Sequence, residues 1–396
     1  MKGLNIPYFY RILISYSFIL GCFCSCNKES NENANSSLNH NEQQIYNWHE
    51  PIIDYAQGFS LKYTGTYKIL DVYSPFQDTK DTLHYVLIPK GNTVPDSLKA
   101  YQQITIPVKK MILTSTTHVA MLAHLDKLDI VTGLTDAAFV FNPEVKSLIE
   151  KDSIKEVGKN GSLNMEVIIA DETDLVISGA WSSTAYDAYR PLLNAGIPVM
   201  IDAEWTEPHP LGRMEWIKVF GALLNEENNA QKLYENSKSE YESLVLKTKN
   251  LDNKPTVING TPYQEAWSIA GGNSFVGTLF KDAGADWYWA QDTSKVSYQM
   301  DFESVYPIGL KADYWIAPGR ATDLSGLQTI DERFSEFNSF KNNQVYNFHG
   351  RANENGMYDY YESGVVKPET ILADLIKILH PDILPEHELF YFKKLD

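Results

Sequence analysis

Three cysteines near the start of the chain offer the clearest covalent chemistry in this sequence of 396 residues. Cys22, Cys24 and Cys26 are its only cysteines, and they directly follow an apolar run at residues 12–21. A run of that length suits a signal peptide and is too short to span a bilayer. The segments ending at Cys22 and at Cys26 both fit cleavage before a cysteine whose thiol then takes a diacylglycerol. We expect residues 1–26 to be a lipoprotein signal peptide, with Cys22 or Cys26 lipidated; an uncleaved anchor or an ordinary signal peptide is the alternative.

The remaining chemically active residues form no catalytic motif. No cysteine follows residue 26, so the folded region has neither a disulfide framework nor a cysteine nucleophile. The nine histidines are scattered, and there is no Gly-rich phosphate loop, no G-x-S-x-G turn and no H-E-x-x-H helix. A formal net charge of -17 argues against binding to nucleic acid. These observations favour a protein that is not an enzyme and that has no cofactor and no dedicated metal site.

The elements that position any site begin with a polar segment and a set of short strands. Residues 27–55 open with Asn, Ser, Glu and Gln, which cannot bury a core, and they predict a flexible tether. Residues 56–108 carry alternating, β-branched stretches separated by turn-forming residues. That pattern predicts antiparallel strands, which we interpret as an N-terminal β extension.

Strand and helix patterns alternate from Lys110 onward. Short apolar runs separated by helices indicate parallel, doubly wound sheets. We therefore expect an α/β fold with two doubly wound lobes, an N-lobe at 109–225 and a C-lobe at 252–396. A last helix is expected near residues 369–379. The strands are expected at residues 111–115, 130–133, 175–178, 199–202, 256–259, 314–317 and 345–348.

One long helix is expected between the lobes. Residues 226–251 contain neither Pro nor Gly, and their apolar side chains recur at helical spacing. At about 1.5 Å per residue such a helix would measure nearly 40 Å, roughly the width of a domain. We expect it to join the two lobes as a stiff backbone.

Two glutamates occupy matching positions in the predicted lobes. Glu166 follows Asn164, and Glu303 follows Asp301, each at the start of a helical run. In both places the Asn or Asp suits a helix cap, and the Glu suits the first turn, where the helix dipole favours negative charge. The lobes therefore look like internal relatives, with chance similarity as the alternative.

Four motifs carry a resemblance to a known family. They are TSTTHVAML at 114–122, PLGRMEW at 210–216, ADYW at 312–315 and ESGVVKP at 362–368. Together they resemble the Bacteroidetes branch of the cobalamin- and iron-siderophore-binding proteins of ABC importers. The resemblance runs from about Gly58 to the C-terminus and does not single out one ligand.

This resemblance implies two α/β lobes, a helical backbone between them, and a ligand held in the cleft. It also implies that one exposed glutamate per lobe docks onto arginines of a permease dimer. By position these are Glu166 and Glu303; the alternative is that each only stabilises its own helix start, and both roles are compatible.

The cleft residues follow from the rule that ligands bind beyond the carboxyl ends of the strands of a doubly wound sheet. The loops at those ends are rich in aromatic and hydrogen-bonding groups, which suit large rigid ligands with delocalised surfaces. Some of these rings would instead pack in a lobe core. The expected ligand-binding residues are Thr116, Thr117, His118, Phe141, Trp181, Trp205, Tyr263, Trp267, Arg351 and Tyr358.

Two of these positions have specific chemistry. Thr116, Thr117 and His118 lie at a strand-to-helix junction, where free N–H groups can hold an anionic oxygen. His118 would donate to the ligand or bind its metal axially, or else it simply packs. Arg351 follows the last expected strand, and its planar fork suits carboxylate or catecholate oxygens, with a surface salt bridge as the alternative.

The sequence thus predicts a lipid-anchored substrate-binding protein, a monomer on the periplasmic side of a bacterial membrane or at the cell surface. It would capture a ferric siderophore and deliver it to an ABC permease. Cobalamin, another corrinoid or haem is the nearest alternative cargo. A surface lipoprotein that relays ligand or acts as a sensor, without docking a permease, is the alternative of a different class.

Overall fold

The computed structural model describes residues 43–159, 161–264 and 266–396. The predicted signal peptide, both candidate lipidation cysteines and residues 27–42 of the predicted tether lie outside the described residues. Residues 43–396 form one unit. Among the described helices, none combines the length and the apolar character needed to cross a membrane.

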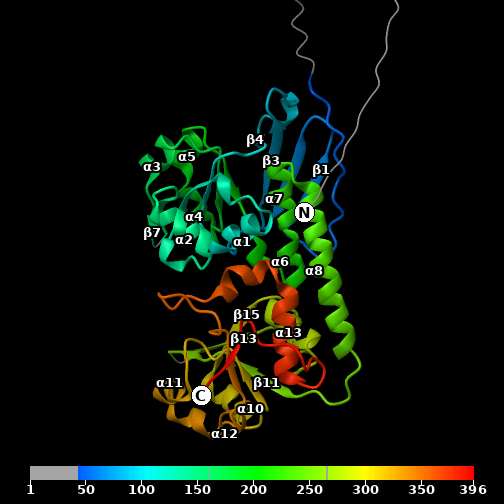
Figure 1. Cartoon of the computed structure of the whole chain (residues 1–396), viewed down its shortest axis with the longest axis vertical. Coiled ribbons are helices and arrows are strands. Elements are labelled where there is room, and N and C mark those ends of the chain that lie inside the picture. Colours follow the sequence, from blue (N-terminus) through cyan, green and yellow to red (C-terminus); the bar gives the residue numbers. More distant parts are fainter. Residues whose placement is uncertain (1–42, 160, 265) are drawn as a thin grey trace, which may run out of the picture. The chain divides into compact units, whose positions relative to one another are not determined.

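A four-stranded sheet precedes the first lobe (Figure 1). Its strands are β1 (Phe59–Tyr63), β2 (Lys68–Tyr73), β3 (Thr82–Pro89) and β4 (Gln102–Ile106). β1, β2 and β3 are antiparallel as expected, but β4 is parallel to β3, so the expectation of antiparallel pairing is wrong for this last pair. The connection through residues 90–101 allows this direction, because it is long enough to return the chain to the start of β3 before β4 begins.

This sheet shares its core with the first lobe. Alternate residues such as Leu70, Val72 and Leu87 are buried together with the strands of that lobe. The hydroxyl of Tyr85 in β3 also accepts a 3.0 Å hydrogen bond from the N–H of Ile201. The β extension is therefore packed onto the N-lobe and does not form a separate core.

The N-lobe sheet confirms the doubly wound α/β architecture. Its strand order is β10-β9-β5-β6-β7-β8, and all neighbours are parallel except β7 and β8. The strands are β5 (Met111–Leu113), β6 (Val131–Thr135), β7 (Lys155–Lys159), β8 (Ser162–Leu163), β9 (Leu175–Ser178) and β10 (Val199–Ile201). The helices are α1 (Thr116–His124), α2 (Pro143–Glu150), α3 (Met165–Ala170), α4 (Ser183–Asp187), α5 (Arg190–Asn194), α6 (Pro210–Glu215) and α7 (Ile217–Leu224). The sequence did not predict β7, because Val157 is its only fully buried residue.

The long helix α8 (Glu227–Thr248) runs beside both lobes (Figure 1). It packs against α7 of the N-lobe and against α13 (Pro368–Leu379) of the C-lobe. Tyr234 belongs to the N-lobe core, and Tyr241, two turns further along, belongs to the C-lobe core. One helix therefore contributes fully buried side chains to both cores, which makes it a stiff link.

The C-lobe contains two sheets. The larger has the order β14-β11-β16-β17-β18, with the last strand antiparallel, and the smaller is the antiparallel sheet β12-β13-β15. The strands of the larger sheet are β11 (Thr256–Asn259), β14 (Asp286–Trp287), β16 (Tyr314–Ile316), β17 (Val345–Asn347) and β18 (Lys393–Lys394). Those of the smaller are β12 (Pro262–Tyr263), β13 (Ala266–Ala270) and β15 (Ser297–Asp301). The helices besides α13 are α9 (Phe275–Asp282), α10 (Phe302–Gly309), α11 (Leu324–Ile330) and α12 (Asn338–Lys341).

The described part of the predicted tether is not free. The backbone N–H groups of Asp54, Tyr55 and Ala56 donate to the carboxylate of Glu215 at 2.7–2.8 Å. Glu215 is fully buried and also pairs with Lys218 at 2.7 Å. A buried carboxylate in the N-lobe therefore binds residues 54–56, a contact that the expectation of a flexible tether over residues 27–55 did not include.

Candidate ligand-binding cleft

A cavity of about 1840 Å³ lies between the two lobes. It is lined by the loops that follow β5, β10, β11 and β16 and by the segment after β17. These are the carboxyl ends of strands, where a doubly wound sheet leaves room for a ligand. Both lobes therefore contribute walls to one cavity.

The start of α1 forms part of the N-lobe wall. Ser115 caps the helix by accepting a hydrogen bond from the N–H of Thr117 at 3.3 Å, and Thr117 and His118 line the cavity. His118 is only 1% exposed, and neither ring nitrogen has a hydrogen-bond partner. Burial lowers the pKa of His118 to about 3, so its ring is neutral at pH 7. His118 therefore brings no positive charge to a ligand.

Asp202 lies behind this wall. Its carboxyl oxygen is 3.6 Å from Nε2 of His118, which is too long for a hydrogen bond. Burial and the nearby Glu204 raise the pKa of Asp202 well above its usual range. A neutral imidazole thus lies beside a buried carboxyl group whose pKa is raised. Within the described residues, no group of three or more His, Cys, Asp or Glu side chains is placed to hold a metal ion.

Arg213 of α6 supplies the innermost positive charge. Its guanidinium donates to the carbonyl oxygen of Trp205 at 3.0 Å and lies 3.8 Å from the ring centre of Phe275 in the C-lobe. Burial lowers the pKa of Arg213, and the carboxylate of Glu204 opposes that shift. An arginine keeps its charge under such conditions, because its ordinary pKa is above 12. The motif at 210–216 contains Arg213, but sequence reasoning assigned it no ligand role.

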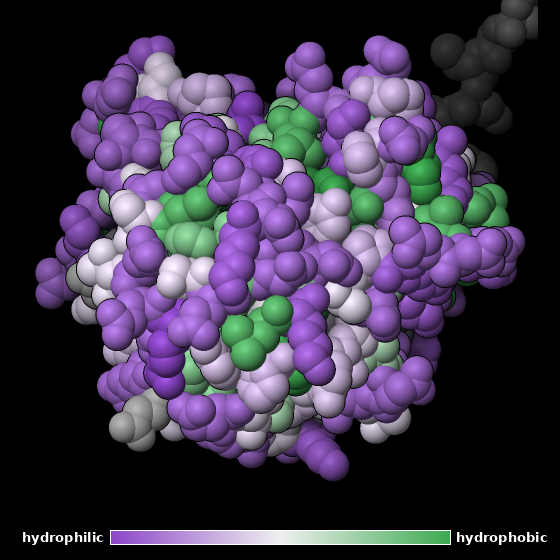
Figure 2. Space-filling view, turned by 90° about the horizontal axis from the view of Figure 1, so that it is seen from below, coloured by the Kyte–Doolittle hydropathy of each residue, from purple (hydrophilic) through white to green (hydrophobic). Residues whose placement is uncertain are grey.

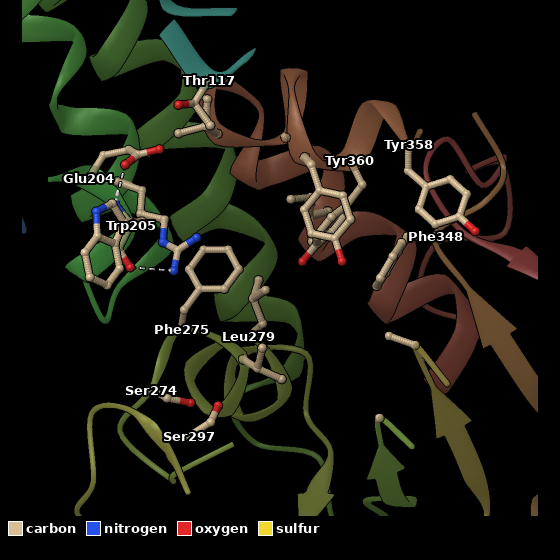
Figure 3. A pocket seen from close by; sticks show the side chains of 18 of the residues that line it. Thr117, Glu204, Trp205, Ser274, Phe275, Leu279, Ser297, Phe348, Tyr358 and Tyr360 are labelled. Carbon is tan, nitrogen blue, oxygen red and sulfur yellow. Dashed lines mark hydrogen bonds between the residues drawn. The ribbon is translucent and has the colours of Figure 1, made fainter. Parts of the chain in front are cut away.

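Aromatic side chains of the C-lobe face Glu204 and Trp205 across the cavity (Figure 3). Phe348 stacks on Tyr360 with ring centres 4.8 Å apart, and Tyr358 meets Phe348 edge-on at 5.5 Å. Phe275 and Leu279 add apolar surface from α9. This wall offers large flat faces and phenol hydroxyls, which suit a bulky ligand with delocalised rings.

The cavity lining carries three cationic side chains and two carboxylates. Arg213, Lys295 and Arg320 are its lysines and arginines, and Glu204 and Glu207 are its carboxylates. Glu207 is already bound, because it accepts hydrogen bonds from the N–H groups of Gln57 and Gly58 and from Nε1 of Trp216. The balance favours a ligand that presents anionic oxygens.

Four predicted ligand residues line this cavity: Thr117, His118, Trp205 and Tyr358. Thr116 begins α1 but does not line it. Trp181 and Tyr263 are also absent from its lining, and both are exposed, by 62% and 80%.

Trp267 is wrongly placed by the sequence prediction. It is fully buried in the C-lobe core among Phe302, Trp315 and Phe337. Its Nε1 donates to the carbonyl oxygen of Asn259 at 2.9 Å. We had expected a loop at this position, but residues 266–270 form strand β13. Side chains of a strand alternate between its two faces, and Trp267 lies on the face that packs in the core.

Arg351 and Phe141 also lie outside the cavity lining. Nε of Arg351 pairs with Asp359 at 2.6 Å, and its guanidinium lies over the rings of Phe141 and Phe390 at 5.0 and 4.5 Å. Arg351 thus follows the ion-pair alternative, in a contact between the lobes. The ligand role predicted for both residues stays a prediction that the lining of this cavity does not support.

The two predicted docking glutamates are exposed on different lobes. Glu166 lies in the first turn of α3, and Glu303 lies in the first turn of α10. The Oε1 atom of Glu303 is 3.1 Å from Nη1 of Arg333. The expected caps are present, because Asn164 accepts from the N–H of Val167 and Asp301 from that of Ser304. The face at the C-lobe end is mainly hydrophilic, with small separate apolar patches (Figure 2). The docking role itself stays a prediction.

Two lobes, a long connecting helix and a cavity between the lobes define a solute-binding protein. Residues 112–352 match the periplasmic binding protein family, and the chain belongs to that family. Its members are substrate-binding proteins and not enzymes. An uncharacterized lipoprotein of Methanocaldococcus jannaschii is 25% identical over 328 residues, which cover 78% of this chain and 75% of the relative. The curated relatives are archaeal, so the Bacteroidetes affiliation stays a prediction.

Solved structures share the fold. A Helicobacter pylori protein solved with Ni(II) bound has a TM-score of 0.55 and 17% identity, covering 72% of this chain and 88% of that chain. A possible iron-binding protein of Staphylococcus epidermidis has a TM-score of 0.53 and 16% identity, covering 69% and 98%. A periplasmic haem-binding protein of Vibrio cholerae has a TM-score of 0.51 and 16% identity, covering 67% and 99%.

Proposed function

We propose that this protein is a lipid-anchored substrate-binding protein that captures a ferric siderophore and delivers it to an ABC permease. The observation that carries the proposal is the cavity of about 1840 Å³, which has an aromatic wall facing Arg213. Typical small-molecule pockets measure roughly 300–1,000 Å³, so this cavity suits a larger cargo.

The chemistry of the cavity fits a metal chelate. The flat faces of Tyr358, Tyr360 and Phe348 would pack against delocalised ligand arms, and Arg213 would pair with anionic oxygens. Relatives described as iron-binding and haem-binding agree with a cargo of this class.

A titration of the chain from Asn27 onward tests the cargo. Tryptophan fluorescence would be followed with a ferric tris-catecholate, a ferric tris-hydroxamate, cyanocobalamin and haemin, and calorimetry would exclude inner-filter effects. We expect saturable one-to-one binding of a ferric chelate at micromolar affinity or tighter. Binding of cyanocobalamin or haemin alone would replace the siderophore as cargo, and no binding by any probe would contradict the proposal.

The same protein is proposed to be anchored by its N-terminal lipid and to dock onto its permease through Glu166 and Glu303. Two curated relatives described as lipoproteins support the anchor. The exposure of both carboxylates, one on each lobe, supports the docking role.

Reversing both docking charges is expected to abolish stimulation of the permease. In the Glu166→Arg/Glu303→Arg protein, like charges would face the permease arginines, and such juxtaposition costs several kcal/mol. We expect a drop of at least about tenfold in cargo-stimulated ATP hydrolysis by reconstituted permease, with cargo affinity unchanged. The matched control reverses two exposed glutamates elsewhere, Glu144→Arg and Glu332→Arg. Equal stimulation by all three proteins would favour the relay or sensor role.

A further inference from the structure

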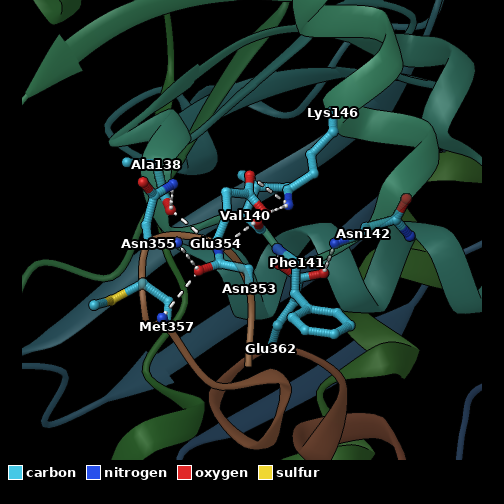
Figure 4. Close-up of polar contacts among 10 residues, drawn as sticks. All are labelled: Ala138, Val140, Phe141, Asn142, Lys146, Asn353, Glu354, Asn355, Met357 and Glu362. Carbon is cyan, nitrogen blue, oxygen red and sulfur yellow. Dashed lines mark hydrogen bonds and ion pairs between the residues drawn. The ribbon is translucent and has the colours of Figure 1, made fainter. Parts of the chain in front are cut away.

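A dense polar contact joins the lobes beside the cavity. Residues 351–362, which we call the clasp, follow β17 of the C-lobe and meet residues 138–146 of the N-lobe (Figure 4). Lys146 and Glu354 form its exposed ion pair at 2.7 Å. Surface pairs of this kind contribute little, so the contact depends on its buried members.

Glu362 is the buried carboxylate of the clasp that bonds to the N-lobe. It is 4% exposed, and its two carboxylate oxygens accept hydrogen bonds from the N–H groups of Phe141 and Asn142, each at 2.7 Å. Burial raises the pKa of Glu362 to about 7, and the hydrogen bonds from the N–H groups of Phe141 and Asn142 oppose this shift. One side chain of the C-lobe thus satisfies two backbone donors of the N-lobe.

Asn353 also makes hydrogen bonds from the clasp to the N-lobe. Its Nδ2 donates to the carbonyl oxygens of Ala138 and Val140 at 3.2 and 3.1 Å. Its Oδ1 accepts from the N–H groups of Asn355 and Met357, each at 2.9 Å. Asn353 therefore holds the turn of the clasp and attaches that turn to the N-lobe at the same time.

The other side of the clasp is a cavity wall. Met357, Tyr358, Tyr360 and Tyr361 all line the cavity. The C-lobe also supports this wall, because the ring of Tyr360 stacks on the ring of Phe348 with ring centres 4.8 Å apart. The aromatic wall is therefore fixed from both lobes, and separating the lobes would break the bonds of Asn353 and Glu362.

We propose that Asn353 and Glu362 are positioning residues: through the N-lobe backbone they hold the aromatic wall of the cavity in its ligand-facing position. The consequence for cargo rests on the function proposed above. A cargo seated against this wall would leave only after the clasp opens. Loss of either residue would therefore speed release, while capture would proceed at about the same rate.

The first test needs no cargo. Hydrogen–deuterium exchange would compare the wild type with Asn353→Ala, Glu362→Ala and the milder Glu362→Gln, which keeps one acceptor oxygen. The N–H groups of Met357, Asp359, Tyr361 and Glu362 are hydrogen-bonded inside the clasp. We expect their exchange to rise by about tenfold or more in both alanine variants and by less in Glu362→Gln, because local opening becomes easier. The exposed Asn342→Ala and Glu332→Ala, which lie outside both the clasp and residues 138–146, are the matched controls.

The second test measures dissociation of a ferric tris-catecholate by stopped-flow. We expect release about tenfold faster in Asn353→Ala and Glu362→Ala, with the association rate changed by less than about twofold. Unchanged exchange at residues 357–362 would overturn the proposal, and so would equal changes in both rates. If the wild type fails to bind the probe, the proposed function fails, and the exchange experiment still decides the clasp. Far-ultraviolet circular dichroism would verify that each variant is folded.

Discussion

The Arg213→Ala protein is expected to bind a ferric tris-catecholate about a hundredfold more weakly than the wild type. Arg213 is the innermost cation of the cavity, held by the carbonyl oxygen of Trp205 and by the ring of Phe275. Truncating one partner of a desolvated charge pair costs roughly 2–5 kcal/mol, and 2.7 kcal/mol corresponds to about a hundredfold. Part of the loss would come from Glu204, whose carboxylate would lose its favourable interaction with the Arg213 guanidinium.

Calorimetry measures the affinity of the Arg213→Ala protein for the ferric tris-catecholate. Two further variants show which property of the arginine is responsible. Arg213→Lys keeps the charge but loses the planar fork, so we expect an intermediate affinity. Arg190→Ala removes an exposed arginine whose partner is Asp187, outside the cavity lining, and it should bind as the wild type does. An Arg213→Ala affinity within about threefold of the wild type would show that the cargo does not meet this guanidinium.

The Glu215→Ala protein is expected to lose about 3–5 kcal/mol of its free energy of unfolding. Glu215 is fully buried, pairs with Lys218, and accepts the N–H groups of Asp54, Tyr55 and Ala56. Its removal leaves the ammonium of Lys218, only 2% exposed, without a counter-charge, and breaking a buried pair in this way has a cost of this size.

Urea unfolding measures the loss as a lower midpoint at unchanged slope. The carbonyl oxygen of Ile52, which also accepts from Lys218, would retain part of the stability. The exposed Glu144→Ala is the control and should change the free energy of unfolding by less than about 0.5 kcal/mol. A loss below about 1 kcal/mol in Glu215→Ala would mean that Lys218 finds another partner or reaches water.

The architecture could be predicted from the sequence because strands and helices follow from patterns of neighbouring residues. The strand at 175–178 is buried throughout, and the apolar pair Val257 and Ile258 is buried in the strand at 256–259. The long helix followed from its apolar spacing, although it ends at Thr248 and not at residue 251. Thr117, Trp205 and Tyr358 line the cavity as expected, because the carboxyl ends of parallel strands meet at one edge; their ligand role stays a prediction.

The rest depended on contacts between distant segments. From the sequence, Trp267 is expected in a loop. Only the pairing of β13 with β15 shows that its side chain faces the core. Arg351 follows the last expected strand, but its contacts with Asp359 and Phe390 hold it away from the cavity. The ordered segment before Phe59 depends on Glu215, which lies about 160 residues later in the chain. No local pattern carries such information.

The most direct test of the central claim, that cargo binds in the cavity between the lobes, is hydrogen–deuterium exchange with and without a saturating ferric tris-catecholate. We expect new protection in both lobes at once, at residues 114–118 and 204–207 of the N-lobe and at residues 357–361 of the C-lobe. Protection confined to one lobe, or to surfaces outside the cavity lining, would contradict it.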